Sequence, residues 1–363
     1  MIQTTVREGV RSFVRLQEEI FLELEREDCI VVHQYRNNGY NIVLDVNSGA
    51  IHVVDDVTYD VIPLFEAHTT GEIVAALKDK YKEEEIKEAC EEVSELKENQ
   101  ELFTPDEYED YIMDFKKRPT VVKALCLHIA HDCNLACRYC FAEEGEYHGR
   151  RALMSYEVGK AALDFLIANS GNRRNLEVDF FGGEPTLNFQ VVKDLVKYGR
   201  EQEKIHNKNF RFTLTTNGVL LNDEIMEFAN KEMANVVLSI DGRKEVNDRM
   251  RPFRGGQGSY DLIVPKFQKL AESRNQEKYY IRGTFTRNNL DFSNDIMHFA
   301  DLGFKQMSIE PVVGDESDPY AIREEDIPKI MEEYDKLAKM MIEREKEGKG
   351  FNFFHFMIDL NGG

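Results

Sequence analysis

From residue 121 to the end of the chain, β-rich runs alternate with amphipathic helical patterns, and this alternation most constrains the fold. Six strand–helix units in succession predict an α/β domain with a parallel sheet, either doubly wound or closed into a partial (β/α)6 barrel. The predicted strands are 122–130, 176–181, 210–216, 236–240, 278–286 and 306–312, and the predicted helices are 155–170, 190–206, 223–231, 259–273, 293–302 and 324–347.

A smaller α+β module is expected in front of this domain, over residues 1–97. Two hairpin turns, at 37–39 and 47–49, separate β-rich runs at 29–35, 40–45 and 50–54. Helical patterns follow over 57–67, 71–81 and 83–97, which together predict a winged-helix-like domain. We expect a linker over 98–120, a core domain over 121–348 and the start of a further element over 349–363.

Composition and charge narrow the class of protein. Hydrophobic residues make up 42% of the 363 positions, which is enough for a folded core. The formal net charge of −21 argues against nucleic acid as a partner, because a polyanion needs clustered Lys and Arg. No run is long and apolar enough to span a membrane, and the N-terminus has no apolar stretch typical of a secretory signal. These features predict a cytoplasmic protein that has no membrane partner.

Three of the six cysteines, Cys133, Cys137 and Cys140, lie within eight residues, directly after the first predicted strand of the barrel. A cytoplasmic chain keeps its thiols reduced, so this C-x3-C-x2-C cluster indicates metal binding before disulfide formation. An iron–sulfur cluster held by three thiolates would keep one iron open, whereas a zinc site would need His131 or His148 as a fourth ligand. Cys29, Cys90 and Cys126 are predicted to be buried small hydrophobes.

Polar or glycine-containing motifs end the later strands, where parallel β/α folds place their active sites. Ser239 and Asp241 point to the same side of a strand and could bind ribose hydroxyls. Arg251 suits a carboxylate, since guanidinium binds carboxylates in a bidentate manner. The other candidates are Gly182, Gly183, Glu184, Pro185, Thr215, Asn217 and Val312.

With Tyr139 before the last cysteine, the C-x3-C-x-aromatic-C motif resembles that of the radical S-adenosylmethionine (SAM) superfamily. The resemblance implies that three cysteines hold a [4Fe-4S] cluster whose fourth iron binds SAM. SAM is then cleaved to methionine and a 5′-deoxyadenosyl radical. It also implies that Gly182, Gly183, Glu184 and Pro185 hold the SAM amino group. Thr215, Asn217, Ser239, Asp241, Arg251 and Val312 would contact the rest of the cofactor.

The front module resembles the RiPP recognition element, which binds the leader of a ribosomally made, post-translationally modified peptide. Such a leader adds a strand to an exposed sheet edge. The edge expected here comprises Ala50, Ile51, His52, Val53 and Val54, flanked by the helix at 83–97. A DNA-binding winged helix is the alternative, but the predicted helices lack a basic face.

The stretch 40–49 and the cysteine motif give the whole chain a resemblance to maturases of SCIFF peptides. It implies thioether formation in a Cys-rich precursor peptide, a low-potential electron donor and auxiliary [4Fe-4S] clusters in a C-terminal SPASM-type domain. No cysteine follows Cys140, so we expect a truncated chain or a naturally short relative. The alternatives are an anaerobic sulfatase-type or other peptide-modifying radical SAM enzyme and, in another class, a non-catalytic peptide-binding metal protein.

Overall fold

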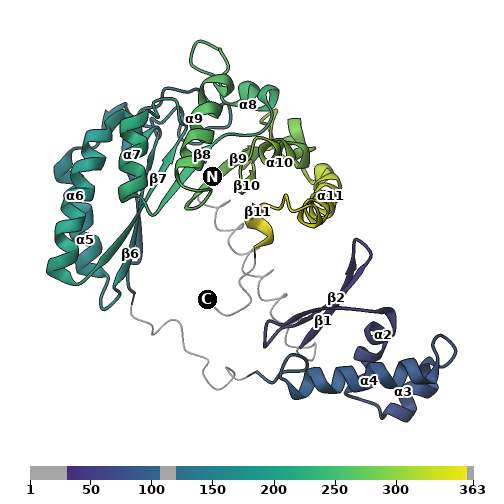
Figure 1. Cartoon of the computed structure of the whole chain (residues 1–363). Helices are drawn as coiled ribbons and strands as arrows, with labels where there is room; N and C mark the ends of the chain where they lie inside the picture. Colours follow the sequence, from purple (N-terminus) through teal and green to yellow (C-terminus); the bar gives the residue numbers. More distant parts are fainter. Residues whose placement is uncertain (1–30, 107–119, 358–363) are drawn as a thin grey trace, which may run out of the picture. The chain divides into compact units, whose positions relative to one another are not determined.

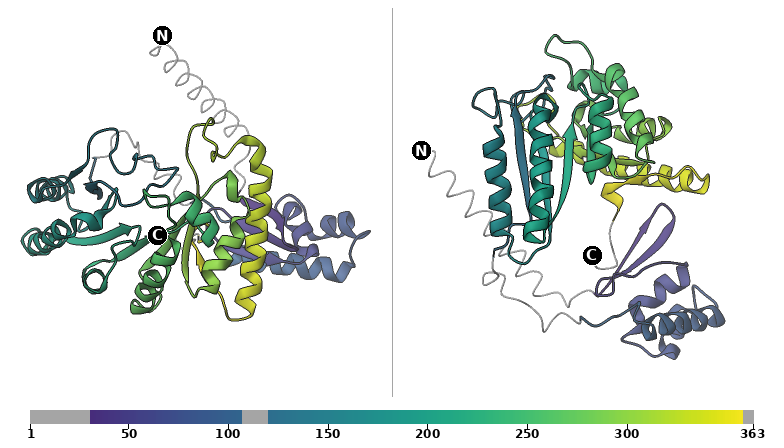
Figure 2. Two further views of the ribbon diagram at one scale, coloured as in Figure 1. Left: turned by 90° about the horizontal axis from the view of Figure 1, so that it is seen from above. Right: turned by 60° about the vertical axis from the view of Figure 1, so that its left-hand side comes forward.

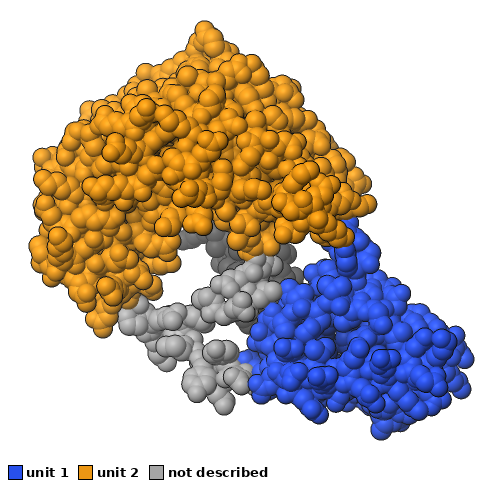
Figure 3. Space-filling view, viewed as in Figure 1, with its two compact units in different colours: residues 1–117, 359–363 blue, residues 118–358 orange. Residues whose placement is uncertain are grey.

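The computed structural model describes residues 31–106 and 120–357 of the chain. The described residues fall into two compact units, the first containing residues 31–106 and the second residues 120–357 (Figure 3). Each unit has its own hydrophobic core, so each is described by itself.

The second unit is built on one sheet with the strand order β11-β10-β9-β8-β7-β6-β4-β5 (Figure 1). Seven of these strands run parallel, and the short β5 pairs antiparallel with β4. Strands β11 and β5 form the two edges, so the sheet is an open barrel. The bounds are β4 (Ala124–His131), β5 (Ala152–Leu153), β6 (Asn175–Gly182), β7 (Asn209–Thr216), β8 (Asn235–Ser239), β9 (Tyr279–Phe285), β10 (Gln306–Pro311) and β11 (Asn352–Phe353).

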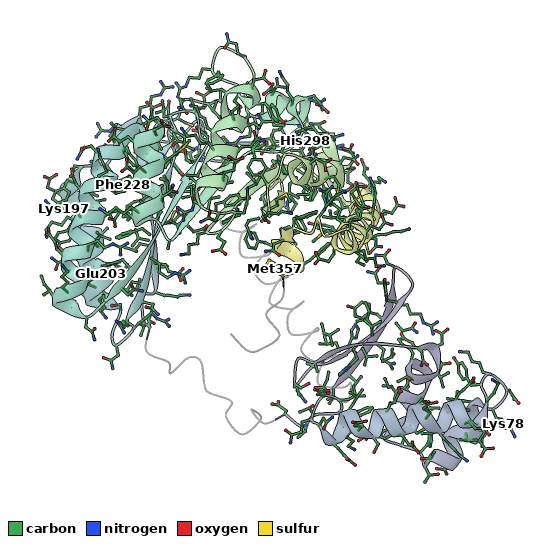
Figure 4. All side chains as sticks on the ribbon, viewed as in Figure 1. Lys78, Lys197, Glu203, Phe228, His298 and Met357 are labelled. Atoms are coloured by element: carbon green, nitrogen blue, oxygen red, sulfur yellow. The ribbon has the colours of Figure 1, made fainter. Side chains whose placement is uncertain are left out.

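Helices cover the outer face of this sheet (Figures 1 and 2). Each of the six long parallel strands is followed by a major helix, which confirms the predicted partial (β/α)6 barrel. Lys197 projects outward from the helix layer (Figure 4). The bounds are α5 (Tyr156–Asn169), η3 (Pro185–Asn188), α6 (Phe189–His206), α7 (Asp223–Glu232), α8 (Lys244–Met250), α9 (Tyr260–Ser273), η4 (Arg287–Asn289), α10 (Phe292–Asp301), η5 (Glu324–Asp326), α11 (Ile327–Lys346) and η6 (Phe354–Phe356).

Side chains alternate between the two faces of the sheet, and only the outer face forms the main core. In β6, Leu176, Val178 and Phe180 are buried under the helices, whereas Asp179 and Phe181 face the barrel interior half-exposed. The interior of the open barrel is therefore available to a ligand. Cys126 lies on this inner face and is exposed, so the prediction that it is a buried hydrophobe was wrong.

Two departures from the predicted elements have local causes. The helix predicted from residue 324 starts as the 3-10 turn η5, and α11 begins at Ile327 because the proline that follows fits the first helical turn. The described part of 349–363 packs onto the barrel, with Phe353 fully buried beside β10. Phe354, Phe356 and Met357, which follow Phe353, are exposed.

The first unit contains a three-stranded antiparallel sheet, β1-β2-β3, and three helices. Buried aliphatic side chains from α2, α3 and α4 pack with Val43 of β2. Cys90 on α4 is buried, as predicted, whereas Cys29 lies outside the described residues. The bounds are β1 (Val32–Asn37), β2 (Tyr40–Asp45), β3 (Ile51–Val54), α2 (Asp56–Phe65), α3 (Thr70–Leu77) and α4 (Glu83–Glu98).

The core of the first unit continues past α4 into the stretch that we assigned to a linker. Leu102 is fully buried, and the ring of Phe103 stacks on Phe65 with 5.9 Å between ring centroids.

Within the described ranges 31–106 and 120–357, no helix is long and apolar enough to cross a membrane.

Candidate active site

A cavity of about 410 Å³ opens at the carboxyl ends of the parallel strands. Its lining joins the loop after β4 to the ends of β6, β7, β8, β9 and β10. Among the sequence-predicted residues it brings together Cys133, Cys137, Tyr139, Cys140, Gly182, Gly183, Glu184, Thr215, Asn217, Ser239, Arg251 and Val312. Pro185 and Asp241 are buried close behind this lining.

The three cysteines sit on a loop that is tied to the segment after α8. The backbone N–H groups of Ala136 and Arg138 donate to the carbonyls of Pro252 and Met250, at 2.8 and 2.9 Å. Burial raises the pKa of the Cys133 thiol to about 12 and that of Cys137 to about 11. Such thiols keep their protons unless a cation compensates the thiolate charge, which is what bound iron does.

The two glycines after β6 allow close contact with the cysteine loop. A Cβ on Gly183 would lie 2.1 Å from the carbonyl oxygen of Asp132, and one on Gly182 would lie 2.5 Å from that of Ala130. The N–H of Gly183 donates to Ala130 at 2.7 Å, and that of Glu184 donates to Asp132 at 2.8 Å. The end of β6 is thus fastened to the residue directly before Cys133.

Glu184 connects the ends of β6 and β7 through a fully buried carboxylate. It accepts hydrogen bonds from the N–H of Thr186 at 3.0 Å, the hydroxyl of Thr216 at 2.8 Å and the N–H of Asn217 at 2.8 Å. The Asn217 amide in turn donates to Asn134 Oδ1 at 2.8 Å and lies 3.6 Å from Cys133 Sγ. Glu184 therefore fixes the position of Asn217 against the cysteine loop.

Tyr139, Asp241 and Arg251 form a buried hydrogen-bonded group behind the cysteines. The Tyr139 hydroxyl donates to Asp241 at 2.8 Å and accepts from Arg251 Nη1 at 2.8 Å. Burial raises the pKa of Tyr139 well above its usual value, so the hydroxyl stays protonated and can donate. Arg251 Nε is buried and has no hydrogen-bond partner among the described residues. An unpaired buried donor beside the cysteines fits the carboxylate of a bound ligand.

The remaining predicted residues differ in what they offer the cavity. Thr215 donates to Asp179 at 3.1 Å, and Ser239 lines the cavity at the end of β8. The N–H of Val312 already donates to Phe285 at 2.9 Å, so Val312 presents its side chain. Asp241 uses its oxygens for Tyr139 and the N–H of Thr284 instead of facing the cavity.

The zinc alternative lacks its fourth ligand. Neither histidine named for it lines the cavity: His131 packs against His128 and Tyr147, and His148 pairs with Glu143 at 2.8 Å. Within the described part of the chain, no three histidine, cysteine, aspartate or glutamate side chains lie close enough to hold one metal ion. Three thiols spread around a larger cavity fit a multi-iron cluster, whose ligated irons occupy separate corners.

The lining residues that sequence reasoning missed include Phe181, Arg282, Thr284 and Glu310. Arg282 and Thr284 alternate with buried residues along β9, so they face the barrel interior. The available signal was a polar residue at every second position of a strand in an otherwise buried parallel sheet.

Comparisons with known proteins agree with this geometry. Residues 127–284 match the family model of the Radical SAM superfamily. An uncharacterized protein, MJ0907, from Methanocaldococcus jannaschii is 30% identical over 190 residues, which cover 52% of this chain and 62% of the relative. A cysteine-type anaerobic sulfatase-maturating enzyme from Clostridium novyi is 26% identical and covers 54% of each chain. The structure of histidine-tagged anSMEcpe with bound AdoMet has a TM-score of 0.57 at 21% identity, covering 65% of this chain and 64% of that one.

The chain spans less than two thirds of the length of each of these proteins. The structural likeness shows the shared fold, while the family model covers both the cysteine loop and the glycine motif after β6. Residues 127–284 match the radical SAM family model and form a domain with the radical SAM fold, for which a [4Fe-4S] cluster and SAM are the implied cofactors.

Proposed function

We propose that this protein is a radical SAM peptide maturase that forms a thioether between a cysteine sulfur and a carbon of a precursor peptide. The observation that carries the proposal is a single cavity lined by three cysteines and by Arg251, whose buried Nε has no hydrogen-bond partner among the described residues. In this arrangement, one ligand can touch a cluster and a fixed guanidinium at the same time.

The protein's own residues would bind and orient the cofactor. Cys133, Cys137 and Cys140 would hold the cluster, and Arg251 would donate from Nε to the SAM carboxylate. The strand ends at Gly182–Gly183 and Thr215–Asn217 would form the opposite wall. When bound and reduced, the cluster supplies an electron that cleaves SAM and yields the 5′-deoxyadenosyl radical. Val312 would limit the cavity on the side of the adenine.

In the proposed reaction, the 5′-deoxyadenosyl radical takes a hydrogen atom from a carbon of the peptide, which gives 5′-deoxyadenosine and leaves a carbon radical on the peptide. The peptide thiol then bonds to the carbon radical, losing a proton to a base and an electron to an auxiliary iron–sulfur cluster. Auxiliary clusters of the SPASM type would suit this step, and we expect a low-potential donor to reduce the first cluster.

The front unit would bind the leader of the precursor peptide at β3. This strand pairs only with β2 in the described sheet, and Ile51 and Val53 are 46% and 65% exposed. A free edge with exposed apolar side chains suits strand addition by a peptide. Ala50 lies just outside the strand, where its carbonyl accepts from the N–H of Asp45 at 3.0 Å.

The test is anaerobic reconstitution with iron and sulfide, followed by SAM and dithionite and a measurement of 5′-deoxyadenosine. We expect product from the reconstituted protein and none from the triple Cys133→Ala/Cys137→Ala/Cys140→Ala variant. A fully iron-loaded protein that makes no 5′-deoxyadenosine would favour the non-catalytic peptide-binding alternative.

The similarity to a cysteine-type sulfatase-maturating enzyme favours one alternative reaction, the oxidation of a peptide cysteine to an aldehyde. Mass spectrometry of the peptide product separates the two reactions. Thioether formation removes two hydrogens and keeps the sulfur, whereas aldehyde formation removes the sulfur.

A further inference from the structure

The cavity has a second end, formed by β9 and β10 across the sheet from the cysteine loop. Arg282 of β9 lines this end with an exposed side chain. Its guanidinium makes no hydrogen bond or ion pair with any residue in the described ranges. An arginine that lines a cavity and has no partner offers up to five N–H donors to a ligand.

Asp179 of β6 lies on the same inner face of the barrel. Its carboxylate accepts one hydroxyl, that of Thr215, at 3.1 Å, which leaves further acceptor capacity toward the interior. Burial raises the pKa of Asp179 to about 6. The hydrogen bond from Thr215 and the positive charge of Arg282 lower the pKa, but by less than burial raises it. Arg282 is therefore near enough to influence Asp179 electrostatically, but the two form no ion pair.

The carboxylate of Glu310 is already in use. Its Oε1 accepts from the Ser308 hydroxyl at 2.6 Å, and its Oε2 lies 3.0 Å from His355 Nε2. The second nitrogen of His355 lies 2.9 Å from the Tyr334 hydroxyl. Glu310 thus contributes a fixed negative charge beside Arg282, while Asp179 and Arg282 have hydrogen-bonding capacity left for a ligand.

This combination selects for a neutral ligand that both donates and accepts hydrogen bonds. Two carboxylates around one guanidinium disfavour a polyanion such as a nucleoside triphosphate. A peptide backbone offers an N–H donor and a C=O acceptor at each residue. We propose that Arg282 donates to a backbone carbonyl and Asp179 accepts from a backbone N–H of a polypeptide segment in the barrel. This inference rests on the proposed function and names residues that hold the peptide substrate inside the barrel, across from the cysteine loop.

The chain contains a reporter for this site. Cys126 of β4 is directly opposite Asp179 of β6 in the parallel register, and its side chain is exposed on the inner face. A ligand that covers Asp179 should therefore shield Cys126 from alkylation. Cys90, which is buried in the other unit, gives the background for the same reagent.

The experiment uses reconstituted protein with SAM and no reductant, so that nothing turns over. Alkylation of Cys126 by N-ethylmaleimide is timed by peptide mapping, alone, with a capped uncharged peptide of Gly, Ala and Ser at millimolar concentration, or with GTP. We expect the peptide to slow Cys126 alkylation at least fivefold and GTP to leave the rate unchanged. Arg282→Gln and Asp179→Ala should each remove most of the protection.

Arg211→Gln is the matched control, because Arg211 is another exposed arginine on the inner face, on β7 and away from the carboxyl ends of the strands. This variant should keep the protection. Equal protection in Arg282→Gln, no protection in the folded wild type, or stronger protection by GTP would overturn the inference. If the wild-type protein forms 5′-deoxyadenosine normally but the peptide does not protect Cys126, only this site is contradicted. If the peptide protects Cys126 but the wild-type protein forms no 5′-deoxyadenosine, only the proposed reaction is contradicted.

Discussion

The two ends of the barrel cavity differ in how their polar side chains are held. At the cysteine end, Glu184 accepts several hydrogen bonds, and Tyr139 connects Asp241 to Arg251. At the β9 end, Arg282 has no hydrogen-bond or ion-pair partner among the described residues. Asp179, on the same inner face of the barrel but on β6, accepts from one hydroxyl.

This difference indicates a division of roles. Preorganised side chains suit a cofactor that binds in one geometry, because no reorganisation is needed when it arrives. Unpaired side chains suit a substrate that brings its own hydrogen-bonding groups. The largest effects of substitution should therefore fall at the cysteine end on SAM cleavage, and smaller effects at the other end on the peptide.

The strongest test of the cysteine end is removal of one ligand. Cys133→Ala should reduce 5′-deoxyadenosine formation to background, since two thiolates cannot hold the cluster that the site requires. Product is measured by chromatography after SAM and dithionite, together with the iron content. Cys126→Ala is the control and should retain cleavage. Full cleavage by Cys133→Ala would refute the ligand assignment.

A glycine variant tests whether the β6 end must touch the cysteine loop. In Gly183→Ala the new Cβ would meet the Asp132 carbonyl at 2.1 Å, so the loop must shift. Displacement by about 1 Å can cost roughly a hundredfold in rate, and we expect a loss of that order in SAM cleavage. Gly71→Ala, where no atom lies within 4 Å, is the control and should leave the rate unchanged.

Arg251→Gln tests the buried guanidinium. Loss of a charged hydrogen bond should weaken SAM binding by about 1.5–3 kcal/mol, measured by titration of the reconstituted protein. Arg249→Gln, at an exposed position on α8, is the matched control. An unchanged SAM affinity in Arg251→Gln would exclude Arg251 from the cofactor site.

Asp179→Asn tests the incomplete pairing of the Asp179 carboxylate on the inner face of the barrel, and the readout is the stability of the protein. Burial raises the pKa of Asp179 to about 6, so its ionised form is disfavoured in the folded state. The wild-type protein should lose stability as the pH rises from about 4 to about 6, and Asp179→Asn should avoid this loss. We expect the variant to be more stable by about 1–3 kcal/mol at pH 8 and equal to wild type near pH 4. Thermal unfolding at both pH values measures this, and a difference that does not depend on pH would contradict it.

The smallest effect is expected in the front unit. Val53→Asp places a charge on the exposed face of β3 and should weaken precursor-peptide binding by about 1 kcal/mol. Fluorescence anisotropy with a labelled precursor peptide measures the change. Peptide-independent SAM cleavage should not change. Val46→Asp is the control, because Val46 is also exposed but lies outside β3, and this variant should bind the precursor peptide like the wild type. A parallel loss of binding and cleavage would show that the unit has only a structural role.

The sequence was sufficient to predict the barrel and to name residues that the structure brings together around one cavity. Strand–helix alternation and residue spacing are local properties, and Cys133, Gly183 and Arg251 lie in recognisable motifs at strand ends. The pairing of side chains was not predictable in this way. Asp241 accepts a hydrogen bond from Tyr139 and forms an ion pair with Arg251. Tyr139 and Asp241 are more than 100 residues apart in the sequence, so only the fold brings them together.

The β9 end was missed for a related reason. Arg282 and Thr284 belong to no motif, and their inward direction depends on the register of β9 within the sheet. Cys126 shows the converse error: we predicted a buried small hydrophobe, as free cysteines usually are, but the open barrel exposes its inner face.

We expect the cysteine end to hold an iron–sulfur cluster with one iron open to SAM. This can be tested by electron paramagnetic resonance of the reconstituted, dithionite-reduced protein, with and without SAM. We expect a [4Fe-4S] signal that shifts when SAM is added and is absent from the triple cysteine variant. A fully iron-loaded protein whose signal does not respond to SAM would contradict it.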